Sequence, residues 1–221
     1  MNAQPFPPSY SRGEELANSI THGLGTLLAI TGLVLLILVA AWHGTARHVV
    51  SSSLYGSTLV LLYLASTLYH AVQQPKAKKI LRIFDHSAIL LLIAGTYTPL
   101  TLISLQGPWG WSLFGTIWGL ALFGIVLEMT SLRRLRILLI ALYLVMGWAV
   151  VIAVKPLLMH VPSKGLWLLL AGGLCYTGGV GFYLWKRLPY HHAIWHLFVL
   201  AGSTLHYLAI FNDVLPHAPA S

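Results

Sequence analysis

Charged residues are scarce in this chain of 221 residues. Asp, Glu, Lys and Arg together make up 8% of it, which is far below the usual share in a soluble domain. Cysteine is limited to Cys175, so no disulfide can form within the chain. Hydrophobic residues instead make up 57%, including eight Trp and ten Tyr. A single soluble core of this length could not bury so much apolar surface, and we therefore expect a protein whose solvent is mostly lipid.

Seven long apolar runs are separated by short polar breaks. A helix needs about 20 apolar residues to cross the roughly 30 Å hydrocarbon layer of a bilayer. We therefore predict an all-α, polytopic protein of the cell membrane, built as a bundle of seven transmembrane helices. The expected spans are residues 17–41, 49–71, 80–103, 109–128, 135–154, 165–185 and 192–211. Around them we expect a disordered N-terminal tail (1–12), the seven-transmembrane domain (13–213) and a C-terminal tail (214–221).

The formal net charge of +8 is distributed unevenly along the chain. Of the 13 Lys and Arg, three lie in the connections of one side, at Arg47, Lys155 and Lys164, and the other ten lie on the opposite side. An excess of Lys and Arg in short loops marks the cytoplasmic face. We therefore predict the N-terminus inside and, after seven crossings, the C-terminus outside. The basic residues are thus explained by their role in setting the orientation and by contact with anionic lipid headgroups. This distribution argues against nucleic acid as a partner.

Several polar side chains lie within the predicted spans, where they are costly in lipid and by default indicate function. With the N-terminus inside, four spans bring such groups to one layer near the cytoplasmic face. They are Glu15 just before the first span and Asn18 and His22 within it, Ser66 and His70 in the second, Asp85 in the third, and His192 and His196 in the seventh. Their convergence at one depth predicts a site.

Three histidines of this layer have the spacing of metal ligands. His192 and His196 are four residues apart and share one helical face. Together with His70 they form a set of three imidazoles that suits Zn²⁺ and leaves a fourth position for water. We expect Asp85 to accept a hydrogen bond from that water as general base, and Ser66 to hydrogen-bond the water or a developing oxyanion.

Other side chains receive supporting roles or none. Glu15, Asn18 and His22 are candidates for outer partners of the metal ligands, and for His22 an ordinary buried histidine is an equal alternative. His86 points about 100° away from Asp85 around the helix, so at most one of the two faces the site. His191 is expected to face headgroups. His206, about 15 Å beyond His196, is expected to bond a neighbouring helix.

Haem is an alternative to zinc. His192 and His206 are 14 residues apart, as ligands on a two-haem helix would be. No other span offers a matching pair of histidines, so at most a single haem remains an alternative.

Four motifs together resemble the bacterial hemolysin III family, also called TrhA-like inner-membrane proteins. The motifs are EELANSITHGLG, SSSLYGSTLVLLYLASTLYHA, LRIFDHSAILLLIAGTYTP and HHAIWHLFVLAGSTLHY. That family is similar to the progestin and adipoQ receptors and, more distantly, to the alkaline ceramidases. The resemblance implies a seven-helix bundle with Zn²⁺ near the cytoplasmic face, bound by His70, His192 and His196, with Ser66 and Asp85 as neighbours.

The resemblance and the site together suggest three functions. The first is a zinc-dependent hydrolase of lipid amides or esters, the established chemistry of the ceramidases, acting in membrane-lipid homeostasis. The second is a receptor-like lipid sensor in which zinc is structural. The third is a haemolytic pore, which is the weakest because no span has a continuous polar stripe from face to face. Membrane lipids are the expected partners, and no oligomeric state is predicted.

Overall fold

The computed structural model describes residues 10–216, and all regular secondary structure in that part is helical. Seven stretches are long and apolar enough to cross a membrane, which confirms the predicted all-α, seven-helix fold. The helices are α1 (Arg12–His43), α2 (Ala46–Ala71), α3 (Pro75–Pro99) with η1 (Leu100–Leu105), α4 (Gly107–Met129), η2 (Ser131–Arg134), α5 (Arg136–Trp148) with η3 (Ala149–Ala153) and α6 (Val154–His160), α7 (Ser163–Leu184), and α8 (His191–Ala209) with η4 (Ile210–Val214).

The first helix begins before its apolar run does. Ser11 caps it: the Ser11 hydroxyl accepts the N–H of Glu14 at 3.2 Å, and the Glu14 carboxylate accepts the N–H of Ser11 at 2.9 Å. This reciprocal pair satisfies donors that a helix start otherwise leaves unpaired. Residues 10–12, which the sequence assigns to the N-terminal tail, are therefore ordered here. The rest of that tail (1–9) and residues 217–221 of the C-terminal tail lie outside the described residues.

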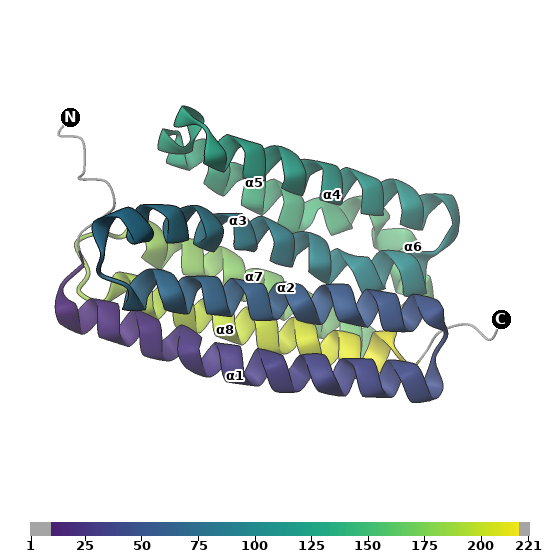
Figure 1. The fold of residues 1–221 in the computed structure, drawn as a ribbon. Coiled ribbons are helices and arrows are strands. Elements are labelled where there is room, and N and C mark those ends of the chain that lie inside the picture. Colours follow the sequence, from purple (N-terminus) through teal and green to yellow (C-terminus); the bar gives the residue numbers. More distant parts are fainter. Residues whose placement is uncertain (1–9, 217–221) are drawn as a thin grey trace.

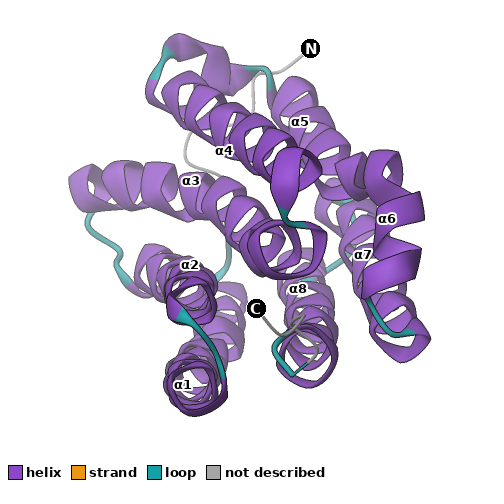
Figure 2. Ribbon diagram, turned by 90° about the vertical axis from the view of Figure 1, so that its right-hand side faces the viewer, coloured by secondary structure: helices purple, strands orange, loops and turns teal. Residues whose placement is uncertain are grey.

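The helices are arranged side by side, with the two ends of the chain at opposite ends of the bundle (Figure 1). α1, α2, α3 and α4 follow one another in space as they do in sequence, and α8 packs against both α1 and α7. The view along the bundle shows α8 next to α1 and α4 on the outer side of α3 (Figure 2). The start of α1, the end of α2 and the start of α8 thus meet at the end where the N-terminus lies (Figure 1).

Polar side chains are buried inside this bundle, and apolar side chains cover its outer faces. Leu27 and Ile137 are 65% and 73% exposed, as expected of residues that contact lipid, whereas Asn18, His70 and His196 are completely buried. Polar groups within membrane spans are tolerated when they face the interior of a bundle. The predicted site residues Asn18, His70 and His196 therefore lie in the interior of the bundle, where side chains from different helices can contact one another.

Close packing between helices fixes the orientation of α8. A methyl group added at Gly172 of α7 would collide with the His206 ring, and one added at Gly202 of α8 would lie 3.0 Å from the Tyr176 ring. Lipid supplies no hydrophobic drive for association, so such close contacts hold transmembrane helices together. They set which face of α8 is turned toward its neighbours.

Candidate metal centre

Three histidines from two helices meet at the end of the bundle that holds the N-terminus. His70 is in the last turn of α2, and His192 and His196 are in the first turns of α8. One possible ligand atom from each lies within 4.8 Å of those of the other two, and all three residues are buried. The predicted convergence of these imidazoles is thus present, and the group could hold a metal ion.

The carboxylate of Glu15 orients the His70 ring. Its Oε2 lies 2.6 Å from Nδ1 of His70, and its Oε1 lies 2.8 Å from Nζ of Lys78. The ionised carboxylate can only accept, so Nδ1 of His70 donates. The unprotonated Nε2 of the same ring is buried and has no hydrogen-bond partner in the described part of the chain. A lone pair on His70 is therefore free for a metal ion.

The same reasoning fixes the ring of His196. Its Nδ1 lies 3.2 Å from the backbone carbonyl of Asn18 and 3.2 Å from the hydroxyl of Thr21. Thr21 donates its own proton to backbone carbonyls of α1 at 2.9 Å, so its oxygen accepts from His196. Nδ1 of His196 is thus the donor, and the buried Nε2 has no partner among the described residues. Asn18 contacts His196 through its backbone carbonyl, and its side-chain Nδ2 lies 3.4 Å from Nδ1 of His70.

His192 completes the cluster within a shell of aromatic rings. Its ring centroid is 4.6 Å from that of His196 and 5.0 Å from that of His70, and neither of its nitrogens has a hydrogen-bond partner in the described residues. Each buried polar group left unpaired costs about 1–3 kcal/mol. A metal ion that prefers nitrogen ligands would bond one unpaired nitrogen of each of the three side chains at once, so these residues fit one.

Ser66 lies one helical turn before His70 in α2, and Asp85 lies in α3. Ser66 is 1% exposed, and its hydroxyl has no partner among the described residues. Asp85 is buried, and its carboxylate is close enough to the phenols of Tyr10 and Tyr69 to interact with them electrostatically. Tyr69 in turn packs against His70, with 4.6 Å between the ring centroids. Asp85 is not among the described residues whose possible ligand atoms converge, and its role as general base stays a prediction.

His86 faces away from the site, as the alternation with Asp85 predicts. Its Nδ1 lies 3.0 Å from Oε1 of Glu128 on α4, and the hydroxyl of Tyr143 lies 3.4 Å from the same oxygen. Glu128 is 1% exposed and was not singled out from the sequence. Its signal was an acidic residue within an apolar run, ALFGIVLEM, which should have indicated a buried partner.

Tyr10 and Lys78 are two further residues of the site that the sequence does not reveal. The Tyr10 ring lies 5.1 Å from that of His192 and 5.9 Å from that of His70, so it covers the end of the cluster. Burial, together with neighbouring tyrosines and carboxylates, raises the pKa of the Tyr10 phenol well above its usual range. Lys78 is buried against Glu15 and also donates to the carbonyl of Tyr69 at 3.0 Å.

Of the predictions made for two other histidines, the one for His191 is wrong and the one for His206 agrees with the structure. His191 is 5% exposed and contacts the Tyr10 ring, so the expectation that it faces headgroups is wrong. His206 donates from Nε2 to the carbonyl of Leu169 at 2.9 Å, as expected of a histidine that bonds a neighbouring helix. Because α7 packs directly against this ring at Gly172, the arrangement disfavours haem ligation by His206.

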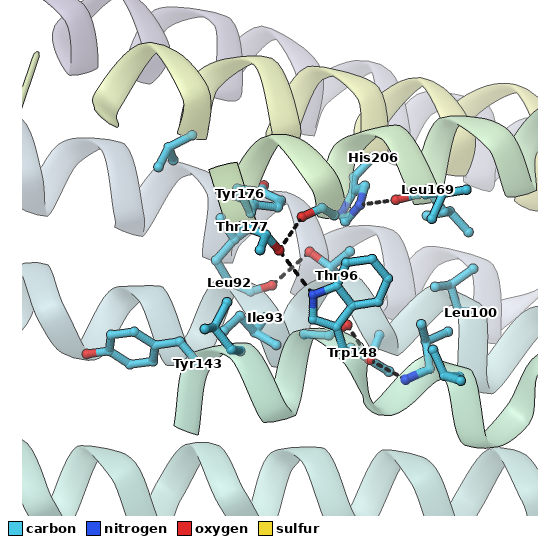
Figure 3. Close-up of a pocket in the computed structure, with 18 of the residues that line it drawn as sticks. Leu92, Ile93, Thr96, Leu100, Tyr143, Trp148, Leu169, Tyr176, Thr177 and His206 are labelled. Atoms are coloured by element: carbon cyan, nitrogen blue, oxygen red, sulfur yellow. Dashed lines mark hydrogen bonds between the residues drawn. The ribbon is translucent and has the colours of Figure 1, made fainter. Parts of the chain in front are cut away.

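A largely apolar cavity of about 490 Å³ begins next to the cluster and lies mainly between α3, α5, α6, α7 and α8. His22 and Asp85 line its end near the histidines, and Leu100 lines its far part. The 15 residues from Asp85 to Leu100 correspond to roughly 22 Å along a helix. Figure 3 shows part of this cavity, where apolar side chains such as Leu92 and Ile93 lie together with a few polar ones such as Thr96.

Comparison with known proteins points to one family. A family model described as "Haemolysin-III related" matches residues 10–207, so Tyr10 lies within the matched domain. The chain is 50% identical to Hemolysin-3 of Bacillus cereus over 205 residues, which cover 93% of this chain and 94% of that protein. It is also 50% identical to the Hemolysin-3 homolog of Bacillus subtilis (strain 168) over 197 residues, 89% of this chain and 92% of that protein. Monocyte to macrophage differentiation factor of Homo sapiens is 29% identical over 207 residues, covering 90% and 84% of the two chains.

Proposed function

Because this chain belongs to the haemolysin-III related family and carries three buried, converging imidazoles, we propose that it binds zinc and hydrolyses an amide or ester bond of a membrane lipid. The reaction would serve membrane-lipid homeostasis at the cytoplasmic side of the bacterial inner membrane. The observation that carries the proposal is the apolar cavity next to the histidine cluster: its end is lined by Asp85 and by His22, whose ring stacks on that of His196.

The donor set supports zinc. His70 and His196 present unprotonated nitrogens because their other nitrogens donate to Glu15 and to Asn18 and Thr21. Such outer partners are typical of histidines that bind zinc. When bound, a zinc ion would supply a Lewis acid that polarises a carbonyl group and makes water a better nucleophile.

Asp85 and Ser66 would carry out the proton and charge chemistry. As water attacks the carbonyl carbon, Asp85 would take its proton. The C–N or C–O bond then breaks, and Asp85 returns the proton to the departing amine or alcohol, so that a carboxylic acid and an amine or alcohol result. The unpaired hydroxyl of Ser66 would donate to the oxygen on which negative charge develops.

The cavity defines the class of substrate. One leaflet is about half of the roughly 30 Å hydrocarbon layer, so a cavity of about 22 Å takes a whole acyl chain. Val151, Leu158 and Trp167 line the cavity and are also exposed on the outer surface of the bundle, where lipid can reach them. These features favour an acyl lipid with its amide or ester group near His22 and Asp85.

A receptor-like lipid sensor is the second candidate. The observation that favours it is that the three histidines come from two helices, so a zinc ion would join α2 to α8. Glu15 and Asn18 of α1 contact His70 of α2 and His196 of α8, respectively. A lipid in the cavity could then shift helices that the metal holds together. The mostly apolar lining of the cavity does not favour the third candidate, a pore, because a water-filled path needs polar groups.

Asp85→Asn tests the hydrolase against the sensor. Purified wild-type and variant protein should both hold about one zinc per chain, while turnover of lipid amides or esters should fall by roughly 10² to 10⁴, the usual contribution of a general base. Asp213→Asn, a buried carboxylate on η4 at the other end of the bundle, is the matched control and should keep full turnover. Turnover undiminished in Asp85→Asn would contradict the assigned role, and a wild-type protein without turnover on membrane-lipid extracts would favour the sensor.

A further inference from the structure

His22 lies at the boundary between the histidine cluster and the cavity. It is 1% exposed, and it lines the end of the cavity together with Asp85. Its ring stacks on that of His196, with 3.5 Å between centroids and 13° between planes, and meets the Tyr63 ring edge-on at 5.0 Å. It is not among the three histidines whose ligand atoms converge. The position of His22 is therefore explained neither by binding the metal ion nor by a hydrogen bond to one of the three metal-binding histidines.

The imidazole of His22 is also unsatisfied. Neither ring nitrogen has a hydrogen-bond partner in the part of the chain that the structure describes. The backbone of His196 is near enough to interact weakly with the ring, but not in hydrogen-bond geometry. A buried polar group without a partner is destabilising, and an apolar ring of similar shape would fill the same space without that cost. A polar group that entered the cavity next to His22 would supply the missing hydrogen bond.

We propose that His22 hydrogen-bonds the amide or ester group of an acyl lipid whose chain lies in the cavity, and thereby selects such lipids over plain hydrocarbon. This inference rests on the proposed function, because it requires a lipid in the cavity. A neutral imidazole has one donor and one acceptor, so it can bond either a carbonyl oxygen or an amide N–H. The Asp85 carboxylate at the same end can only accept when ionised, so His22 supplies the donor that a lipid carbonyl needs.

Two photoreactive probes of equal chain length can test this selection. One is an acyl amide that carries a diazirine near the chain end, and the other is an alkyl diazirine without the amide. Zinc-loaded wild-type protein should be labelled by the amide probe at lower concentration than by the hydrocarbon probe. His22→Phe should lose that preference by at least about fivefold, the low end for one buried hydrogen bond left unmade, with labelling by the hydrocarbon probe unchanged.

Control variants separate hydrogen bonding from packing. Phe can still stack on His196, so His22→Phe should keep its zinc and unfold at the same or a higher temperature without lipid, because two unpaired nitrogens are gone. Thr96→Val removes a hydroxyl elsewhere in the cavity at nearly constant shape and should keep the preference for the amide. If His22→Phe loses zinc or stability, His22→Leu makes the same comparison with a smaller side chain.

The outcomes distinguish the inference from the function on which it rests. Equal preference for the amide probe in wild type and in a stable, zinc-loaded apolar variant would overturn the inference alone. A wild-type protein labelled by neither probe would overturn both the lipid-binding role of the cavity and the inference. Loss of the preference in the His22 variants but not in Thr96→Val would support the hydrogen bond from this imidazole.

Discussion

Glu15 and His70 are 55 positions apart in the sequence, and their side chains lie 2.6 Å apart between α1 and α2. Lys78, at the start of α3, holds the other carboxylate oxygen at 2.8 Å. This buried series of Lys78, Glu15 and His70 fixes both the rotation of the imidazole and the nitrogen that carries its proton. It therefore connects three helices to one candidate metal ligand.

Glu15→Gln should weaken zinc binding by roughly 10- to 100-fold, the usual effect of removing an outer partner of a metal-binding histidine. The amide keeps the shape of the side chain but loses the charge that pairs with Lys78 and polarises His70. Competition with a chelator measures the affinity. Glu14→Gln is the matched control, because Glu14 contacts Ser11 and the backbone of Tyr190 instead of the cluster. Equal affinity in wild type and Glu15→Gln would contradict the role of this carboxylate.

Removal of a proposed ligand should have a larger effect. Wild-type protein should hold about one zinc per chain, and His192→Ala or His196→Ala should each lose most of it. Both variants should also unfold at lower temperature, because a metal bound only to the folded state stabilises it by mass action. His206→Ala on the same helix changes the same side chain outside the cluster and should retain its zinc. Full occupancy in either ligand variant, by elemental analysis, would rule out the assignment.

The fold could be predicted from the sequence because the bilayer imposes one rule on each stretch separately. A span needs a certain length of apolar residues wherever it occurs, so seven runs predicted seven helices. The ends were less predictable, because they depend on local hydrogen bonds. The capping pair of Ser11 and Glu14 starts α1 at Arg12, within the segment assigned to a tail.

The site was predictable where its geometry is local. The spacing of His192 and His196 follows from one helix, and their depth follows from the order of the spans. Lys78 was not predictable, because nothing in PKAKKI distinguishes it from Lys76 or Lys79 before α3 is packed against α1. The position of Tyr10 over His192 likewise depends on contacts between distant parts of the chain.

The distribution of Lys and Arg predicts how the bundle is oriented in the membrane. The histidine cluster lies at the end of the bundle that carries the connections rich in Lys and Arg, which should face the cytoplasm. A phosphatase reporter fused after Ser221 should therefore be active outside the inner membrane, and a fluorescent protein fused before Met1 should fold inside. Both termini on one side would contradict an odd number of crossings.

The reactivity of the Lys186 amine tests the charge environment at the end of the bundle that holds the histidine cluster. This amine lies 4.2 Å above the Tyr183 ring just after α7. Lys186 is exposed as a residue, but partial desolvation of its amine, together with the nearby Arg136, lowers the pKa of Lys186 to about 8. At pH 8 about half of such amines are neutral and nucleophilic, which is roughly 100-fold more than for a lysine with the usual pKa near 10.4. An amine-acylating reagent at pH 8 should therefore modify Lys186 well before Lys164, which is also exposed, as measured by mass spectrometry of the digested protein.

Arg136→Gln provides the control for this reactivity. Without the neighbouring positive charge the pKa of Lys186 should rise, so labelling at pH 8 should slow while labelling of Lys164 stays the same. The lowered pKa also sets the sign of a stability effect. Between about pH 8 and 10.5 the unfolded chain binds more protons at Lys186 than the folded chain does, so this residue should make the folded protein more stable as the pH rises through that range. Equal labelling of Lys186 in wild type and Arg136→Gln would show that these two cations do not interact in the folded protein.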